Sequence, residues 1–198
     1  MQLGRRGKMN IQEQVLALPS SDELAEIRRS SCLKQEQERK RKEREVQKLA
    51  AAFLTEVQAR VDAQLDQILS GLSHNLRAAA AAGRTRTTVV DIDLTYSQFV
   101  TLREAPGLVP AAPDALRWLG VGGADPPTFR RTVQTVRPEH MNTFVMYQAG
   151  RELVRLLSTS EDCKRKSLEV DEVLEVNELV TAPGEKVRAG RFSVGISF

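Results

Sequence analysis

A long stretch without proline, from Ser21 to Ala82, constrains the fold of this chain more than any other feature of its sequence. Ser20 and Glu23 form a capping box at its start, in which the two side chains satisfy backbone donors of the first helical turn. Gly83 is a helix stop, because glycine adopts the left-handed conformation at a helix end without strain. The stretch predicts one helix of roughly 90 Å, at about 1.5 Å per residue, and a body built from the remaining residues is too small to cover all of it.

The first charged part of this helix, Lys34 to Glu45, has no apolar residue and predicts a solvent-exposed segment. Glu36 with Lys40 and Glu38 with Lys42 place opposite charges four residues apart, and each such pair stabilises a helix by about 0.2–0.5 kcal/mol. The basic residues are also a candidate phosphate-binding or nuclear-import cluster, although no aromatic residue lies among them for stacking on bases. These candidates are Arg39, Lys40, Arg41, Lys42 and Arg44.

An apolar stripe follows along one side of the same helix, with an average spacing of 3.75 residues. Its members are Val46, Leu49, Phe53, Val57, Val61, Leu65, Ile68, Leu72 and Leu76. A two-stranded coiled coil repeats every 3.5 residues, so this spacing favours packing along a broader surface. We expect one end of the stripe to pack on the chain's own body and the other to bind a partner. The predicted partner-binding residues are Val46, Leu49, Phe53, Val57, Val61 and Leu65.

The rest of the chain predicts an α+β body. Polar and apolar residues alternate at 87–94 and 191–198, and each of these segments predicts a strand. Residues 128–136 predict a further strand. An apolar face over 139–158 predicts the main helix of the body, opened by a proline. Residues 168–180 fit a strand by their valines and a helix by their overall pattern, so both assignments stay open.

The last predicted strand has one bulky face and one small face. The bulky face carries Phe192, Val194, Ile196 and Phe198, and the small face carries Ser193, Gly195 and Ser197. We expect this strand to lie within the sheet, and something to pack closely on its small face.

Proline marks the main loop region of the body, from Pro106 to Pro127, around a helical turn at Pro113 to Leu119. The predicted fold is a small mixed or antiparallel sheet with a covering helix and a long N-terminal helical extension. Its expected organisation is an arm with short helices at 1–33, the charged and then amphipathic helix at 34–82, and the α+β body at 83–198.

The net charge of +3 is distributed unevenly along the chain. Residues 1–86 hold 16 Lys and Arg against 11 Asp and Glu, whereas residues 87–198 hold 13 against 15. A basic N-terminal part can bind nucleic acid, an acidic lipid surface or an acidic protein face. No apolar run reaches the length of a membrane span, and the first residues lack the apolar core of a secretory signal. Cys32 and Cys163 have no metal-like spacing and are expected to be reduced thiols in a cytoplasmic or nuclear protein.

Candidate catalytic and metal-binding residues are few. His74 and His140 are the two histidines, and no third ligand is nominated for a zinc site. Asp91 and Asp93 share one strand face and are a candidate for Mg²⁺, although a solvated strand face beside basic residues is the simpler interpretation. Gly120 to Gly123 lacks the lysine and hydroxyl of a P-loop and predicts a turn. The sequence therefore predicts no catalytic constellation, no metal site and no cofactor.

Three functional hypotheses follow. The first is a non-enzymatic structural or adaptor subunit of a larger assembly, such as a virion shell or an organellar complex, that binds other protein subunits through its long helix. The second is a nucleic-acid-associated protein that binds phosphate backbone through the basic residues of that helix. The third is a metal-dependent enzyme at Asp91 and Asp93. The expected location is inside the cell or within a large particle.

Overall fold

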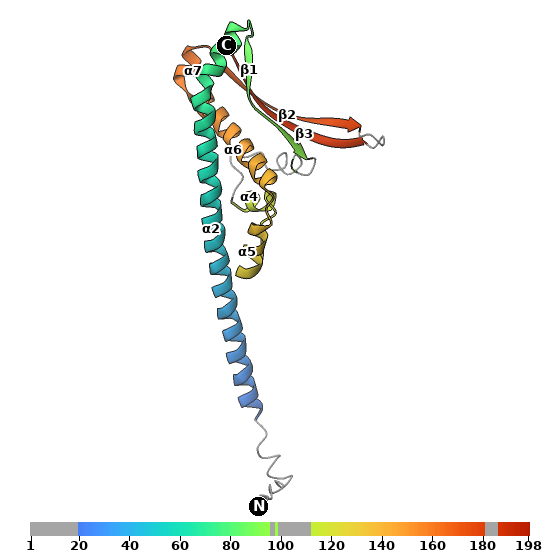
Figure 1. Cartoon of the computed structure of the whole chain (residues 1–198). Helices are drawn as coiled ribbons and strands as arrows, with labels where there is room; N and C mark the ends of the chain where they lie inside the picture. The colour runs from blue at the N-terminus through green and yellow to red at the C-terminus, as the bar shows by residue number, and fades with distance from the viewer. Residues whose placement is uncertain (1–19, 96–97, 99–111, 181–185) are drawn as a thin grey trace, which may run out of the picture. The chain divides into compact units, whose positions relative to one another are not determined.

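The computed structural model describes residues 20–95, 98, 112–180 and 186–198 and confirms the predicted α+β class (Figure 1). The chain divides into two compact units, Met1–Arg44 and Glu45–Phe198, and the boundary falls inside the first helix. In chain order the elements are α2 (Ser21–Ala81), β1 (Arg86–Thr95), α4 (Ala112–Trp118), α5 (Pro126–Gln134), α6 (Pro138–Thr159), α7 (Glu161–Arg165), β2 (Glu169–Val180) and β3 (Lys186–Ser197).

Both ends of α2 carry the capping interactions that the sequence predicts. The backbone N–H of Ser20 donates to Glu23 Oε2 at 2.7 Å, and the N–H of Glu23 donates to Ser20 Oγ at 3.2 Å. At the other end Gly83 has φ +70°, and the N–H of Arg84 donates to the carbonyl of Ala79 at 3.0 Å. This left-handed turn satisfies carbonyls that the helix end would leave without a donor, and it ends α2 just before β1 begins.

The three strands form one antiparallel sheet in the order β1-β3-β2 (Figure 1). The C-terminal strand β3 is therefore central, which confirms that it lies within the sheet. Its Phe192, Val194 and Ile196 are fully buried. The ambiguous segment 168–180 is strand β2, paired residue for residue with β3 from Glu169 opposite Ser197 to Val180 opposite Lys186.

Helix α6 contacts all three strands and covers the face that carries Phe192 and Val194. A Cβ at Gly150 of α6 would lie only 2.8 Å from Phe192 Cε1, so the absence of a side chain lets the helix lie close against β3. One helical turn earlier, the ring of Tyr147 meets the ring of Phe192 edge-on with centroids 4.7 Å apart. The opposite face of the sheet carries mainly polar residues, with Val173 among them.

The core continues from α6 to α2. The α6 residues on the predicted apolar face are all in contact with the core, namely Met141, Phe144, Val145, Ala149, Leu153, Leu156 and Leu157. Trp118 of α4 packs on Phe144 with ring centroids 4.9 Å apart. The four buried residues that α2 contributes to the same core are Phe53, Val57, Val61 and Leu65.

The strand predicted at 128–136 is wrong, because this segment forms helix α5. Asp125 caps the helix, accepting a hydrogen bond from the backbone N–H of Thr128 at 3.0 Å. Pro126 and Pro127 occupy the first helical positions, where a missing N–H costs nothing. The threonines and valines of the segment favour a strand by propensity, but the cap and the two prolines outweigh them.

The proline-rich loop is also shorter than predicted. Pro126 and Pro127 belong to α5, and the helical turn predicted around Trp118 is α4. Gly120 to Gly123 forms the predicted turn between α4 and α5, and Thr132 Oγ1 donates to the carbonyl of Gly122 at 2.7 Å. Residues 1–19, 96–97, 99–111 and 181–185 lie outside the described part of the chain, and so do the first part of the arm predicted at 1–33 and the start of the loop predicted from Pro106.

Candidate functional site

The N-terminal part of α2 presents its side chains to solvent along its whole described length. In residues 20–44 every residue except Ala25 is exposed. Three apolar side chains are among them: Leu24 is 44% exposed, and Ile27 and Leu33 are each 59% exposed. Leu24 and Ile27 lie three residues apart and so share one side of the helix. The described part of this unit thus offers contact surface and no enclosed site.

Ion pairs within the helix hold much of its charge. Lys40 Nζ lies 2.7 Å from Glu36 Oε1, and Lys42 Nζ lies 3.0 Å from Glu38 Oε1, which confirms the two predicted pairs. The hydrogen bond from each lysine lowers the pKa of its glutamate below the ordinary value. Arg39 pairs with a further glutamate in the same way. These exposed pairs keep a solvated helix wound.

The five predicted phosphate-binding residues are therefore not equivalent. Arg39, Lys40 and Lys42 are engaged by glutamates, whereas Arg41 and Arg44 form no salt bridge with any described residue. Lys34, also without a salt bridge in this part of the chain, lies seven residues before Arg41 and so points to the same side of the helix. We name Lys34, Arg41 and Arg44 the free basic face.

The predicted partner-binding stripe lies largely in the chain's own core. Phe53, Val57, Val61 and Leu65 are buried, and Val46 and Leu49 are partly buried against the same core. The period of the stripe correctly indicates a buried helix face. The period does not distinguish a surface of the same chain from a surface of another molecule. In the structure the buried residues of the stripe pack on the same chain.

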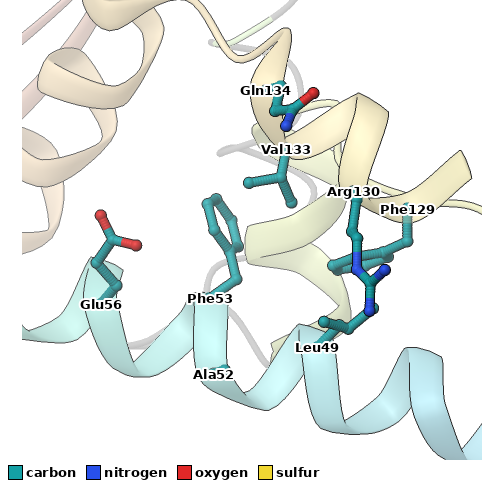
Figure 2. Close-up of a pocket in the computed structure, with 8 residues that line it drawn as sticks. All are labelled: Leu49, Ala52, Phe53, Glu56, Phe129, Arg130, Val133 and Gln134. Carbon is teal, nitrogen blue, oxygen red and sulfur yellow. The ribbon is translucent and has the colours of Figure 1, made fainter. Parts of the chain in front are cut away.

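Beside the stripe is an apolar pocket of about 300 Å³ between α2 and α5 (Figure 2). Leu49 and Phe53 point from α2 toward Phe129 and Val133 of α5. The remaining lining residues are Ala52, Glu56, Arg130 and Gln134. Arg130 Nη2 lies 3.3 Å from Glu45 Oε1, which ties α5 to α2 at this point. The pocket is suited to an apolar side chain, because most of its lining residues are apolar. Its few polar groups include no nucleophile with an adjacent base, as a catalytic site would require.

The aspartates proposed for Mg²⁺ face an arginine. Arg191 of β3 donates from Nε to Asp91 Oδ1 at 2.8 Å and from Nη2 to Asp91 Oδ2. These hydrogen bonds lower the pKa of Asp91 below its ordinary value and raise the pKa of Arg191. Both carboxylate oxygens of Asp91 thus already bind a guanidinium group. The ion pair between neighbouring strands is a sufficient reason for an aspartate at this position.

Other titratable groups are dispersed. Among the described residues no three His, Cys, Asp or Glu side chains gather as metal ligands would. His74 and Cys32 are exposed, and His140 and Cys163 are half-buried. Burial raises the pKa of Tyr147, which lies beside the ion pair of Arg151 Nη1 and Glu172 Oε1 at 2.8 Å.

Comparison with known proteins finds no family model, no curated protein and no solved structure that matches this chain. Of the helices in the described part, none combines the length and apolar character that crossing a membrane requires. Function must therefore be inferred from the surfaces of the molecule.

Proposed function

We propose that this chain is a non-enzymatic structural or adaptor subunit of a larger protein assembly, and that a protein partner binds the exposed part of α2. The observation that carries the proposal is the exposure of residues 20–44 together with the apolar Leu24, Ile27 and Leu33. A helix of this kind gains only a few tenths of a kcal/mol from each ion pair, whereas most helices in proteins are stabilised by packing on an apolar face. A partner that covers Leu24 and Ile27 would supply that packing.

The experiment that tests this proposal compares two variants of the full chain expressed in the cells it comes from. L24S/I27S removes the exposed apolar pair, and L69S is the matched control, since Leu69 lies elsewhere on the same helix and is 37% exposed. We expect the wild type and L69S to migrate in an assembly heavier than one chain, by size-exclusion chromatography with light scattering, and L24S/I27S to be released from it. A wild-type monomer whose lysines from Lys34 to Lys48 crosslink only within the chain would refute the proposal.

The free basic face favours a second candidate function, binding of a nucleic-acid phosphate backbone. Within the described residues Arg41 and Arg44 form no salt bridge, so they could neutralise phosphates without displacing a carboxylate of that part of the chain. The other three predicted phosphate-binding residues would first have to leave their glutamates. We rank this function second because the described segment 20–44 interleaves acidic and basic residues along its length.

A further inference from the structure

The two edges of the sheet differ in regularity. Along β1 the pairing with β3 is interrupted between Thr88 and Val90, where Val89 is left without an opposite residue. Bulges of this kind twist an edge and hinder the addition of another strand. Along β2 the register with β3 continues over all twelve residues without a shift. The edge formed by β2 is therefore the one with the geometry to accept a further strand.

Backbone groups are available along this edge. Within the described residues β2 pairs with β3 alone, and β3 is the central strand (Figure 1). In an antiparallel pair, alternate residues direct their N–H and C=O groups away from the neighbouring strand. Those of β2 point to the outside of the sheet, where an extended chain can form hydrogen bonds with them.

The side chains of β2 indicate what kind of chain fits. The strand contains five acidic residues and no Lys, Arg or His. On the open face of the sheet Glu169 and Glu175 are exposed and form no salt bridge with any described residue, whereas Asp171 pairs with Arg86. On the face toward α6 the strand carries the half-buried Leu174, and Val176, which is 40% exposed. The open side of the edge is therefore mainly acidic, although Val173 lies on it, and the side toward α6 is mainly apolar, with Glu172 held in its ion pair with Arg151.

We propose that β2 is a docking edge for an extended segment of a partner protein that alternates Lys or Arg with apolar residues. Residues directly opposite each other on adjacent strands share a face of the sheet, so the cations of the partner would lie beside Glu169 and Glu175. Its apolar residues would lie beside Leu174 and Val176 and extend the layer that packs on α6. The β2 strand of a second copy is a poor occupant, because pairing would bring acidic residues of both strands together.

This docking edge is independent of the function proposed for α2, because it uses no residue of that helix. Its test uses the full chain and a short peptide that alternates lysine and valine. We expect the peptide to bind and to protect alternate backbone amides of β2 from hydrogen exchange. A peptide with glutamate in place of each lysine is expected to bind at least about tenfold more weakly, because each attraction becomes a repulsion.

A matched pair of variants separates the β2 edge from the general charge of the sheet. Glu175 and Asp93 lie in the same row of the sheet, one on each side of Arg191. The negative charge of each helps to raise the pKa of Arg191. E175K is expected to weaken binding of the lysine peptide about tenfold, whereas D93K, two strands away at about 10 Å, is expected to change it about twofold at most. Circular dichroism verifies that both exposed substitutions leave the fold intact.

Four results of these experiments, and one further observation, would overturn the docking edge. The four results are no binding of the lysine peptide at low salt, equal binding of the glutamate peptide, amide protection on β1 instead of β2, and equal effects of E175K and D93K. Dimerisation of the free chain through β2 would also overturn it, because a second copy would then be the occupant.

Discussion

Arg86 of β1 pairs with Asp171 of β2 by crossing over the central strand between them. The crossing point is Gly195, which lies opposite Asp171 in the register of β2 and β3. A Cβ at this glycine would lie 2.6 Å from Arg86 Nε and 2.8 Å from Asp171 Oδ1. Because Gly195 has no side chain, the guanidinium of Arg86 can lie across β3 at this point. The ion pair thus connects the two outer strands over the small face of β3.

G195A is expected to displace the Arg86 side chain and break its pair with Asp171. Because both partners are about half exposed, such a pair stabilises a fold by less than about 1 kcal/mol, so we expect a small loss of stability in urea unfolding. In an R86A background the guanidinium is gone, and the Asp171 carboxylate, no longer held by it, can turn away from the new methyl group. The same substitution should then be neutral or slightly stabilising, since alanine restricts the unfolded chain. An equal loss in both backgrounds would show that the glycine is needed for some other reason.

Prediction from sequence succeeded where the signal is local. The capping box of Ser20 and Glu23, the stop at Gly83 and the apolar face of α6 each depend on residues within one or two helical turns of each other. The small face of β3 was also predicted to accept something packed closely. The side chain that packs there belongs to Arg86. This depends on the order of the strands and on their register, and neither can be obtained from the spacing of residues in one strand.

The wrong strand and the stripe on α2 show two limits of prediction from sequence alone. The threonines and valines of residues 128–136 suit a strand by propensity, although Asp125 and the two prolines after it are a helix-start signal that could have been recognised. For the stripe on α2 the period predicts a buried face, but only the folded chain shows that Phe53 packs in the same molecule. Local propensity is a weak preference, and burial by itself does not identify the covering surface.

G150A should destabilise the protein, although alanine is the better helix former. In a free helix this substitution stabilises by about 0.5–1 kcal/mol, but here the new methyl group would overlap the ring of the fully buried Phe192. Forcing extra atoms into a packed core costs typically about 1–3 kcal/mol. Urea unfolding followed by the fluorescence of Trp118, the one tryptophan, measures the change.

The matched control for this prediction is G71A in α2. The nearest heavy atom to a Cβ there is Asn75 Nδ2 at 3.8 Å, which is ordinary contact. We expect G71A to raise the urea midpoint of unfolding, because alanine is a better helix former than glycine and meets no steric obstacle there. If G150A were as stabilising as G71A, the close approach of α6 to β3 would be wrong.

I196A and F198A are expected to differ sharply, although Phe198 follows directly after the end of β3 and lies only two residues from Ile196. Ile196 is fully buried, and truncating such a residue costs about 2–5 kcal/mol through lost burial and the cavity left behind. Phe198 is 38% exposed, so its loss should cost much less. Thermal unfolding of both variants gives the comparison, and similar melting temperatures would contradict the central position of β3.

D91N should make the stability of the protein less sensitive to acid. The hydrogen bonds from Arg191 hold the pKa of Asp91 below its ordinary value of 3.8 in the folded state. A group with a lowered pKa contributes stability that is present above the unfolded pKa and is lost as the pH falls through the folded pKa. We therefore expect the wild type to lose more stability than D91N below about pH 4, and the two to respond alike between pH 5 and 7.

The measurement is the urea midpoint of each protein as a function of pH at fixed ionic strength. The difference will be modest, because both side chains of the pair are substantially exposed and water screens them. D93N is the control, since Asp93 lies on the same strand face without a salt bridge to a described residue. Identical acid profiles for the wild type and D91N would show that the pair with Arg191 does not persist in solution.

R41Q/R44Q tests whether the free basic face binds phosphate backbone. If it does, the double variant should weaken binding of duplex DNA about equally for all sequences, and the slope of log K against log salt should fall by about two, one unit for each lost contact. The matched control is K40Q/K42Q, which removes the same charge from residues that are paired with Glu36 and Glu38. We expect this control to retain most of the binding, because those lysines neutralise carboxylates before they meet a phosphate. Equal losses in both variants would mean that only net charge matters, and absence of binding at low salt would exclude the phosphate-binding function and leave the protein assembly role.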